Sequence, residues 1–125
     1  MSASPLVISW FEIPVTNFAR AKAFYEAVTG RTIEPMEVGP VTMGFLSSDP
    51  NAVGGAIVHG DGGVPSKQGT IIYLSGGDDL APMLARVVGA GGSIVVPKTE
   101  IGNDFGCFAH FVDTEGNKVG LHSMT

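Results

Sequence analysis

The strongest constraint on the fold of this chain is an internal repeat. An offset of 62 residues, about half of the 125-residue chain, superimposes Asn17 on Asp79 and brings matching apolar runs after both into line. The register then slips by two residues, so that Asp49 corresponds to Asp113 near the end of each half. A repeat of this length indicates two copies of one structural unit. Identical pairs include Ala19 and Ala81, Ala23 and Ala85, Gly30 and Gly92, Pro35 and Pro97, and Gly44 and Gly106.

Both halves show the same order of predicted elements. Each opens with an apolar, β-prone run, continues with a helix after Asn17 or Asp79 as N-cap, and ends that helix at Gly30 or at Gly91 and Gly92. The predicted strands are 7–15, 32–36, 41–47, 53–59, 70–74, 93–97, 107–112 and 118–122. The predicted apolar helix faces are Phe18, Ala21, Phe24, Tyr25 and Val28 in the first half, and Leu80, Met83, Leu84, Val87 and Val88 in the second, where Pro82 falls in the first turn.

These elements predict an α+β fold of two tandem βαβββ modules forming a curved mixed sheet around a cavity. One helix covers one face of a four-stranded sheet and leaves the other face open, so two such modules can enclose a cavity. We predict a single domain over residues 1–125. Module one spans about 5–60, a glycine-rich linker about 60–69, and module two about 70–123.

Composition excludes several classes of function. The net charge of −5 argues against nucleic acid and anionic membranes as partners, and no apolar run is long enough to span a bilayer. Cys107 is the only cysteine, which rules out an internal disulfide. The segment Met1 to Pro5 has neither a basic region nor an apolar one, so we expect no signal peptide and a cytoplasmic location. Only 15% of residues are charged against 44% apolar, which favours burial of an apolar face in a homodimer.

Two stretches of the sequence carry distinctive motifs, Val15 to Tyr25 followed by Gly30, and Phe111 to Leu121. They resemble motifs of the vicinal oxygen chelate superfamily, which includes glyoxalase I, bleomycin-resistance proteins and extradiol dioxygenases. The first runs from Val15 to Tyr25 and is followed by Gly30; it resembles the pattern V-x-D, A-x-x-F-Y, G, with Asn17 in place of Asp. The second, Phe111 to Leu121, resembles the turn F-x-D-P-E-G-N before the last strand. The resemblance covers roughly residues 7–123. It implies the βαβββ fold, a glyoxalase-like type and frequent dimerisation, and it says little about the reaction.

The resemblance also implies four metal-ligand positions, on the first and last strands of each module. In this sequence they fall on Trp10, near Ile72, near Ala56 or Ile57, and on Gly120. None of these residues supplies the imidazole, thiolate or carboxylate donors that a divalent cation needs. We therefore predict no metal and no other cofactor, with a divalent metal as the alternative.

Glu12 and His122 are the candidate catalytic residues. Each lies two positions beyond an implied ligand position, so strand alternation places it on the cavity side. They could act as a general base and acid, or form a relocated metal pair with His59. They could equally be buried polar groups that bond one another or the backbone.

Trp10, Tyr73, Phe108 and His59 are the candidate ligand-binding residues. The aromatic rings can line a pocket, or simply fill the core. His110 shares a face with Phe108, and a single histidine is more often structural than catalytic. The sequence contains neither a phosphate-binding loop nor a G-x-S-x-G nucleophile elbow.

Three hypotheses follow for the function. The first is a metal-independent binding protein that holds a small aromatic or cationic ligand in the cavity between the modules. The second is a lyase or isomerase, similar to lactoylglutathione lyase, that uses Glu12 and His122 with or without a divalent metal. The third is an interaction protein with a vestigial cavity.

Overall fold

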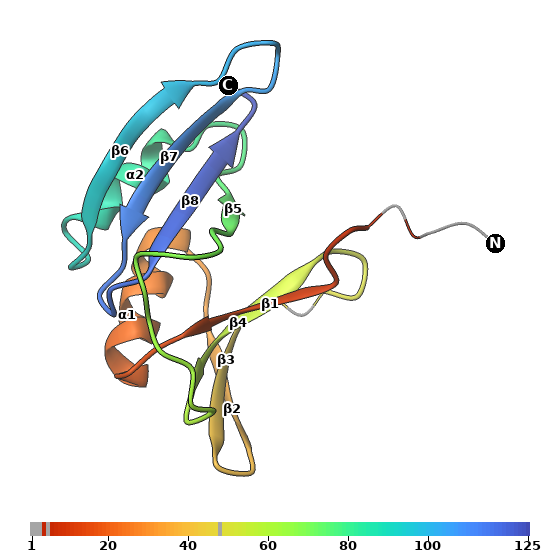
Figure 1. Cartoon of the computed structure of the whole chain (residues 1–125), viewed down its shortest axis with the longest axis vertical. Helices are drawn as coiled ribbons and strands as arrows, with labels where there is room; N and C mark the ends of the chain where they lie inside the picture. Colours follow the sequence, from red (N-terminus) through yellow and green to blue (C-terminus); the bar gives the residue numbers. More distant parts are fainter. Residues whose placement is uncertain (1–3, 5, 48) are drawn as a thin grey trace.

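The computed structural model describes residue 4, residues 6–47 and residues 49–125. It shows the predicted α+β fold of two tandem βαβββ modules, with the eight strands in two four-stranded sheets (Figure 1). Most of the segment Met1 to Pro5, on which we based the absence of a signal peptide, lies outside the described residues. Among the described residues, no helix has the length and apolarity needed to cross a membrane.

Module one forms a sheet with the strand order β1-β4-β3-β2. Strand β1 pairs parallel with β4, and the other two pairs are antiparallel. The elements of the module are β1 (Trp10–Pro14), α1 (Phe18–Thr29), β2 (Glu34–Val38), β3 (Val41–Ser47) and β4 (Gly54–His59).

Module two repeats this topology with the strand order β5-β8-β7-β6. Here too the first strand of the module pairs parallel with the last, and the remaining pairs are antiparallel. The elements are β5 (Tyr73–Ser75), α2 (Ala81–Val87), β6 (Ser93–Glu100), β7 (Cys107–Val112) and β8 (Lys118–Ser123).

The ends of α1 form as the sequence predicts. The side chain of Asn17 accepts a hydrogen bond from the backbone N–H of Arg20 at 3.0 Å, which satisfies one of the free N–H groups of the first turn. Gly30 takes a left-handed conformation with φ 72°, and its N–H donates to the carbonyl of Glu26.

Several element boundaries differ from the predictions, and β2, for example, is Glu34–Val38 instead of 32–36. The four largest differences are in β1, β5, β6 and α2. Strand β1 begins only at Trp10, because the preceding residues are exposed, and β5 begins at Tyr73 instead of residue 70. Strand β6 continues to Glu100, since it stays paired with β7 through two register shifts. Helix α2 ends at Val87, which leaves Val88 exposed instead of on the apolar face.

The start of α2 also differs from the prediction that Asp79 is its N-cap. The N-cap position is Leu80, which has helical dihedral angles and no side-chain cap bond. The Asp79 carboxylate still accepts from the N–H of Ala81 at 2.9 Å, and it also binds Lys98 at 2.8 Å. Both partners lower the pKa of Asp79, the ion-paired Lys98 more strongly.

A single hydrophobic core joins the two modules. Helices α1 and α2 lie against one another, and the ring of Phe24 on α1 lies 5.8 Å from that of Phe111 on β7. The added Cβ of an alanine at Gly92 would meet Phe24 at 2.8 Å, so the close approach of the modules requires glycine there. Figure 1 shows both helices on one side of the second sheet, with its other face uncovered. The helices thus leave a free face on that sheet for a site.

The turn between β7 and β8 ties module two to α1. The hydroxyl of Tyr25 donates to the carboxylate of Asp113 at 2.6 Å, and both residues are buried. Burial raises the pKa of Tyr25 well above its ordinary value, and the charge of Asp113 raises it further. The other Asp113 oxygen accepts from the backbone N–H groups of Glu115 and Asn117, so the turn is fixed from both sides.

The carboxylate of Glu115 is buried at the start of α1. It accepts from the N–H groups of Thr16 and Asn17, and it forms a two-point ion pair with Arg20 at 2.7 and 3.1 Å. Burial alone would raise the pKa of Glu115, but hydrogen bonds from Arg20, Asn17, Thr114 and Thr16 outweigh it and bring the pKa to about 2. Glu115 therefore anchors the first helix of one module on the last turn of the other.

Candidate functional site

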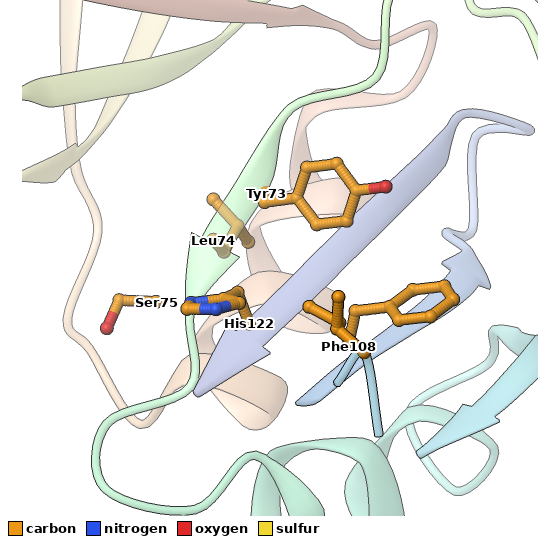
Figure 2. Close-up of a pocket in the computed structure, with 6 residues that line it drawn as sticks. Tyr73, Leu74, Ser75, Phe108 and His122 are labelled. Atoms are coloured by element: carbon orange, nitrogen blue, oxygen red, sulfur yellow. The ribbon is translucent and has the colours of Figure 1, made fainter. Parts of the chain in front are cut away.

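The open face of the second sheet carries a cluster of aromatic and polar side chains. Register places Tyr73 opposite Gly120, and it places Ser75 and Phe108 on either side of His122. Because strand side chains alternate, Tyr73, Ser75, Phe108 and His122 all lie on the face away from α2. A pocket of about 570 Å³ opens here (Figure 2), lined by Tyr73, Leu74, Ser75, Ile101, Phe108 and His122.

Two histidine hydrogen bonds hold the walls of this pocket. The Nε2 atom of His122 lies 2.7 Å from the carbonyl oxygen of Phe105, and the hydroxyl of Tyr73 lies 2.8 Å from Nε2 of His110. Burial lowers the pKa of His110, and the positive charge of Lys118 lowers it further. Figure 2 shows the Tyr73 hydroxyl directed away from His122, so Tyr73 presents its ring to the pocket.

In each module, an aromatic side chain on the first strand covers a glycine on the last. Trp10 is paired with Gly54 and Tyr73 with Gly120. A Cβ on Gly120 would overlap the ring of Tyr73, and a Cβ on Gly54 would come within 2.9 Å of the Trp10 indole. The two aromatic–glycine pairs occupy corresponding places in the two sheets, although the 62-residue offset aligns Tyr73 with Phe11, and both depend on glycine for space.

This pairing corrects one detail of the implied metal-ligand positions. Ile72 precedes β5, and the residue opposite Gly120 is Tyr73. Among residues 4, 6–47 and 49–125, no group of three or more His, Cys, Asp or Glu side chains is placed to hold a metal ion. An indole at Trp10, a phenol at Tyr73, an alkyl side chain at Ala56 or Ile57 and a glycine at Gly120 occupy the implied positions, so these residues do not fit a divalent cation.

On the first sheet, Trp10 and Glu12 share the open face. The indole N–H of Trp10 donates to the Glu12 carboxylate at 3.3 Å, and its ring lies edge-on to Phe45 at 5.9 Å. In the part of the chain that the structure describes, no hydrogen bond joins Glu12 to His122, which lies on the other sheet. His59 and Glu12 face opposite sides of the first sheet. His59 lies two residues after the core residue Ile57 on the same strand, so it faces the side that carries the core.

The structure therefore separates the predicted site residues into three places. Tyr73, Phe108 and His122 meet in one pocket, Trp10 and Glu12 lie on the first sheet, and the Nδ1 atom of His59 lies 3.0 Å from the carbonyl oxygen of Val15. A second cavity of about 540 Å³ lies between the modules and includes Phe11, Arg31, Tyr73 and Met83 in its lining.

Sequence reasoning missed Leu74, Ser75 and Ile101 as lining residues. Ser75 could have been found by alternation, since it lies two residues after Tyr73 on the same strand. Ile101 could not, because it enters the pocket from the loop after β6. The backbone of this loop turns sharply, with Asn103 and Asp104 at φ 53° and 61° and with the N–H of Ile101 bonded to the carbonyl of Gly106.

The sequence and the fold together identify the protein superfamily. Residues 7–121 match the family model described as the Glyoxalase/Bleomycin resistance protein/Dioxygenase superfamily, and the chain belongs to this superfamily. The proposed resemblance is thereby confirmed. No curated protein matches the sequence.

Solved structures agree with this assignment. A V278E mutant of glyoxalase I from Zea mays superimposes with a TM-score of 0.73 at 20% identity, over 99% of this chain and 48% of that one. A glyoxalase/bleomycin resistance protein/dioxygenase domain from Frankia sp. EAN1pec gives 0.69 at 16% identity, over 98% and 93%. A glyoxalase/bleomycin resistance protein from Albidiferax ferrireducens T118 gives 0.65 at 16% identity, over 94% of this chain and 98% of that one. The chain spans about half of the maize protein, and these identities establish the fold alone.

Proposed function

We propose that this chain is a metal-independent binding protein that holds a small organic molecule on the open face of its second sheet. The proposal rests on the pocket formed by Tyr73, Phe108 and His122. The sequence predicted His122 as a catalytic candidate and Tyr73 and Phe108 as ligand-binding candidates. A volume of about 570 Å³ falls within the ordinary range of small-molecule sites.

The chemistry of the lining supports binding over metal-assisted catalysis. Four of the six lining side chains are aromatic or aliphatic, and the polar ones are a hydroxyl, Ser75, and an imidazole, His122. Apolar walls with a few placed polar groups are typical of sites that bind and orient a ligand. The alternative lyase or isomerase reaction with Glu12 and His122 stays an untested prediction, and no contact between these residues favours it.

Thermal shift with a panel of small molecules tests the proposal. The panel includes neutral, anionic and cationic aromatic compounds, and the buffer contains a chelator. A specific ligand at about 100 times its Kd stabilises the folded chain by about 2.7 kcal/mol. Phe108→Ala removes a pocket wall and should abolish the shift, whereas Val88→Ala, at an exposed position that does not line the pocket, should leave the shift unchanged.

Two results would count against this function. Stoichiometric zinc, nickel or iron in untagged, purified protein would overturn the metal-free part of the proposal. A panel that shifts no melting temperature would favour the third hypothesis, an interaction protein with a vestigial cavity.

We also propose that the chain forms a homodimer. The face of the first sheet exposes Trp10, Met36 and Val38, with 37%, 50% and 51% of each residue accessible. Exposed apolar patches of this kind commonly mark protein interfaces. Light scattering after size exclusion should give twice the chain mass. Val38→Lys should reduce the measured mass towards that of a single chain. Val64→Lys, a change at an exposed position outside both sheets, should leave the measured mass unchanged.

A further inference from the structure

The hydrogen bond of His122 fixes which of its nitrogens carries the proton. Its Nε2 atom lies 2.7 Å from the carbonyl oxygen of Phe105, and a carbonyl oxygen can only accept. The proton therefore resides on Nε2. In a neutral imidazole the second nitrogen, Nδ1, then has a lone pair and no hydrogen, so it acts only as an acceptor.

The other polar groups around the pocket are largely engaged. The Tyr73 hydroxyl is paired with His110 at 2.8 Å, and the Ser75 hydroxyl oxygen accepts from the N–H of Gly77 at 3.3 Å. None of the six lining side chains is an Asp, Glu, Lys or Arg. A charged ligand would lose its hydration in this pocket without a side chain of opposite charge to replace it.

The aromatic side chains that line the pocket favour a flat ligand. Phe108 lies edge-on to His110 at 5.3 Å, and Tyr73 lies 5.5 Å from the same imidazole, so the three rings brace one another. Tyr73 is also supported from below by Gly120, where no side chain intervenes. Rings held in this way offer faces and edges for a further aromatic ring at ordinary stacking distances.

From these observations we propose that the pocket selects uncharged aromatic molecules bearing a hydrogen-bond donor, which is accepted by Nδ1 of His122. This inference rests on the proposed binding function and specifies its ligand class. The donor is required because an apolar ligand would leave the Nδ1 lone pair buried without a partner, and an unpaired buried acceptor is costly.

Titration calorimetry at pH 8, above the ordinary titration range of imidazole, tests the proposal with matched naphthalene probes. The probes are 2-naphthol, 2-methoxynaphthalene, 2-naphthoate and 2-naphthylmethylammonium. We expect 2-naphthol to bind about tenfold more tightly than 2-methoxynaphthalene, which has the same ring system without the donor. We expect both ions to bind more weakly than 2-naphthol.

Two variants assign the effect to His122. His122→Phe keeps an aromatic ring but removes the acceptor, so the two neutral probes should bind within about twofold of one another. His122→Asn keeps an amide oxygen near the position of Nδ1 and an N–H₂ donor, so part of the preference for 2-naphthol should remain. If the phenylalanine variant fails to fold, His122→Leu, which also lacks the acceptor, replaces it, and a preference for 2-naphthol that survives in that variant contradicts the role of Nδ1.

The outcomes separate this inference from the broader function. Equal binding of the two neutral probes to the unmodified chain, or tighter binding of either ion, overturns the inference and leaves a binding protein of another ligand class. Absence of binding by every probe, with another ligand found in the wider panel, overturns this inference and leaves the proposed binding function in place. Absence of any ligand in both experiments overturns the inference and the proposed function together.

Discussion

Substituting Glu115 by glutamine should destabilise the whole fold in a pH-dependent way. The change keeps the size of the side chain and removes the charge that binds Arg20 and the first turn of α1. The pKa of Glu115 is about 2 in the folded chain against an ordinary 4.5, and each pKa unit corresponds to about 1.4 kcal/mol. The upper limit is therefore about 3 kcal/mol. Because the Arg20 side chain is half exposed and its charge is screened by solvent, we expect about 2 kcal/mol at pH 7.

The sign of the pH dependence follows from the lowered pKa. Glu115 contributes its full stability above about pH 4.5, and this contribution is lost as the pH falls towards 2. Urea unfolding of both chains should show a difference in free energy that falls to under about half of its pH 7 value by pH 3. Glu100→Gln is the control, since no hydrogen bond joins the Glu100 carboxylate to a described residue. A difference that is negligible at pH 7, or that does not change with pH, would refute the reasoning.

Three further predictions follow from the contacts of the core and the pocket. Gly120→Ala should rotate the half-exposed Tyr73 ring away and break its bond to His110, at a cost of about 1 kcal/mol; an unmoved ring in a crystal structure would contradict this. Tyr25→Phe should lower the free energy of unfolding by about 1–3 kcal/mol, because it removes a buried bond to Asp113; urea denaturation measures the loss, and an unchanged midpoint would argue against the bond. NMR titration of His110 should give a midpoint below its ordinary pKa of 6.5. The stability that the neutral His110 side chain contributes is therefore present above about pH 6.5 and is lost as the pH falls. A midpoint above 6.5 would be inconsistent with the burial of this side chain.

The sequence predicted the architecture because the repeat constrains both halves at once. A helix bounded by Asn17 and Gly30 forms as expected, since local hydrogen bonds and a left-handed dihedral angle determine its ends. The start of β5 and the length of β6 were not predictable in the same way. Pairing with neighbouring strands determines them, and β6 stays paired with β7 despite two register shifts that no local pattern reveals.

The site was predictable only as far as strand alternation extends. Alternation from Gly120 placed His122 on the cavity side, but only the strand register, which pairs Tyr73 with Gly120 and Phe108 with His122, brings the three residues into one pocket. The partner of His122 is a backbone carbonyl, which side-chain chemistry cannot indicate. It reaches Nε2 because the loop at Asn103 and Asp104 adopts left-handed dihedral angles. The idea that Glu12 works with His122 relied on alternation within each strand, which says nothing about the distance between two sheets.

The shared core has a consequence for how the duplicated halves behave. Residues from both modules, among them Ile13, Phe24, Leu84 and Phe111, belong to one continuous cluster, and a buried carboxylate from the second half holds the start of the first helix. The two modules therefore share one topology but do not fold independently. Neither module should unfold while the other stays folded. A protease cut between β4 and β5 would leave two fragments that remain bound, because each supplies the apolar surface that the other buries.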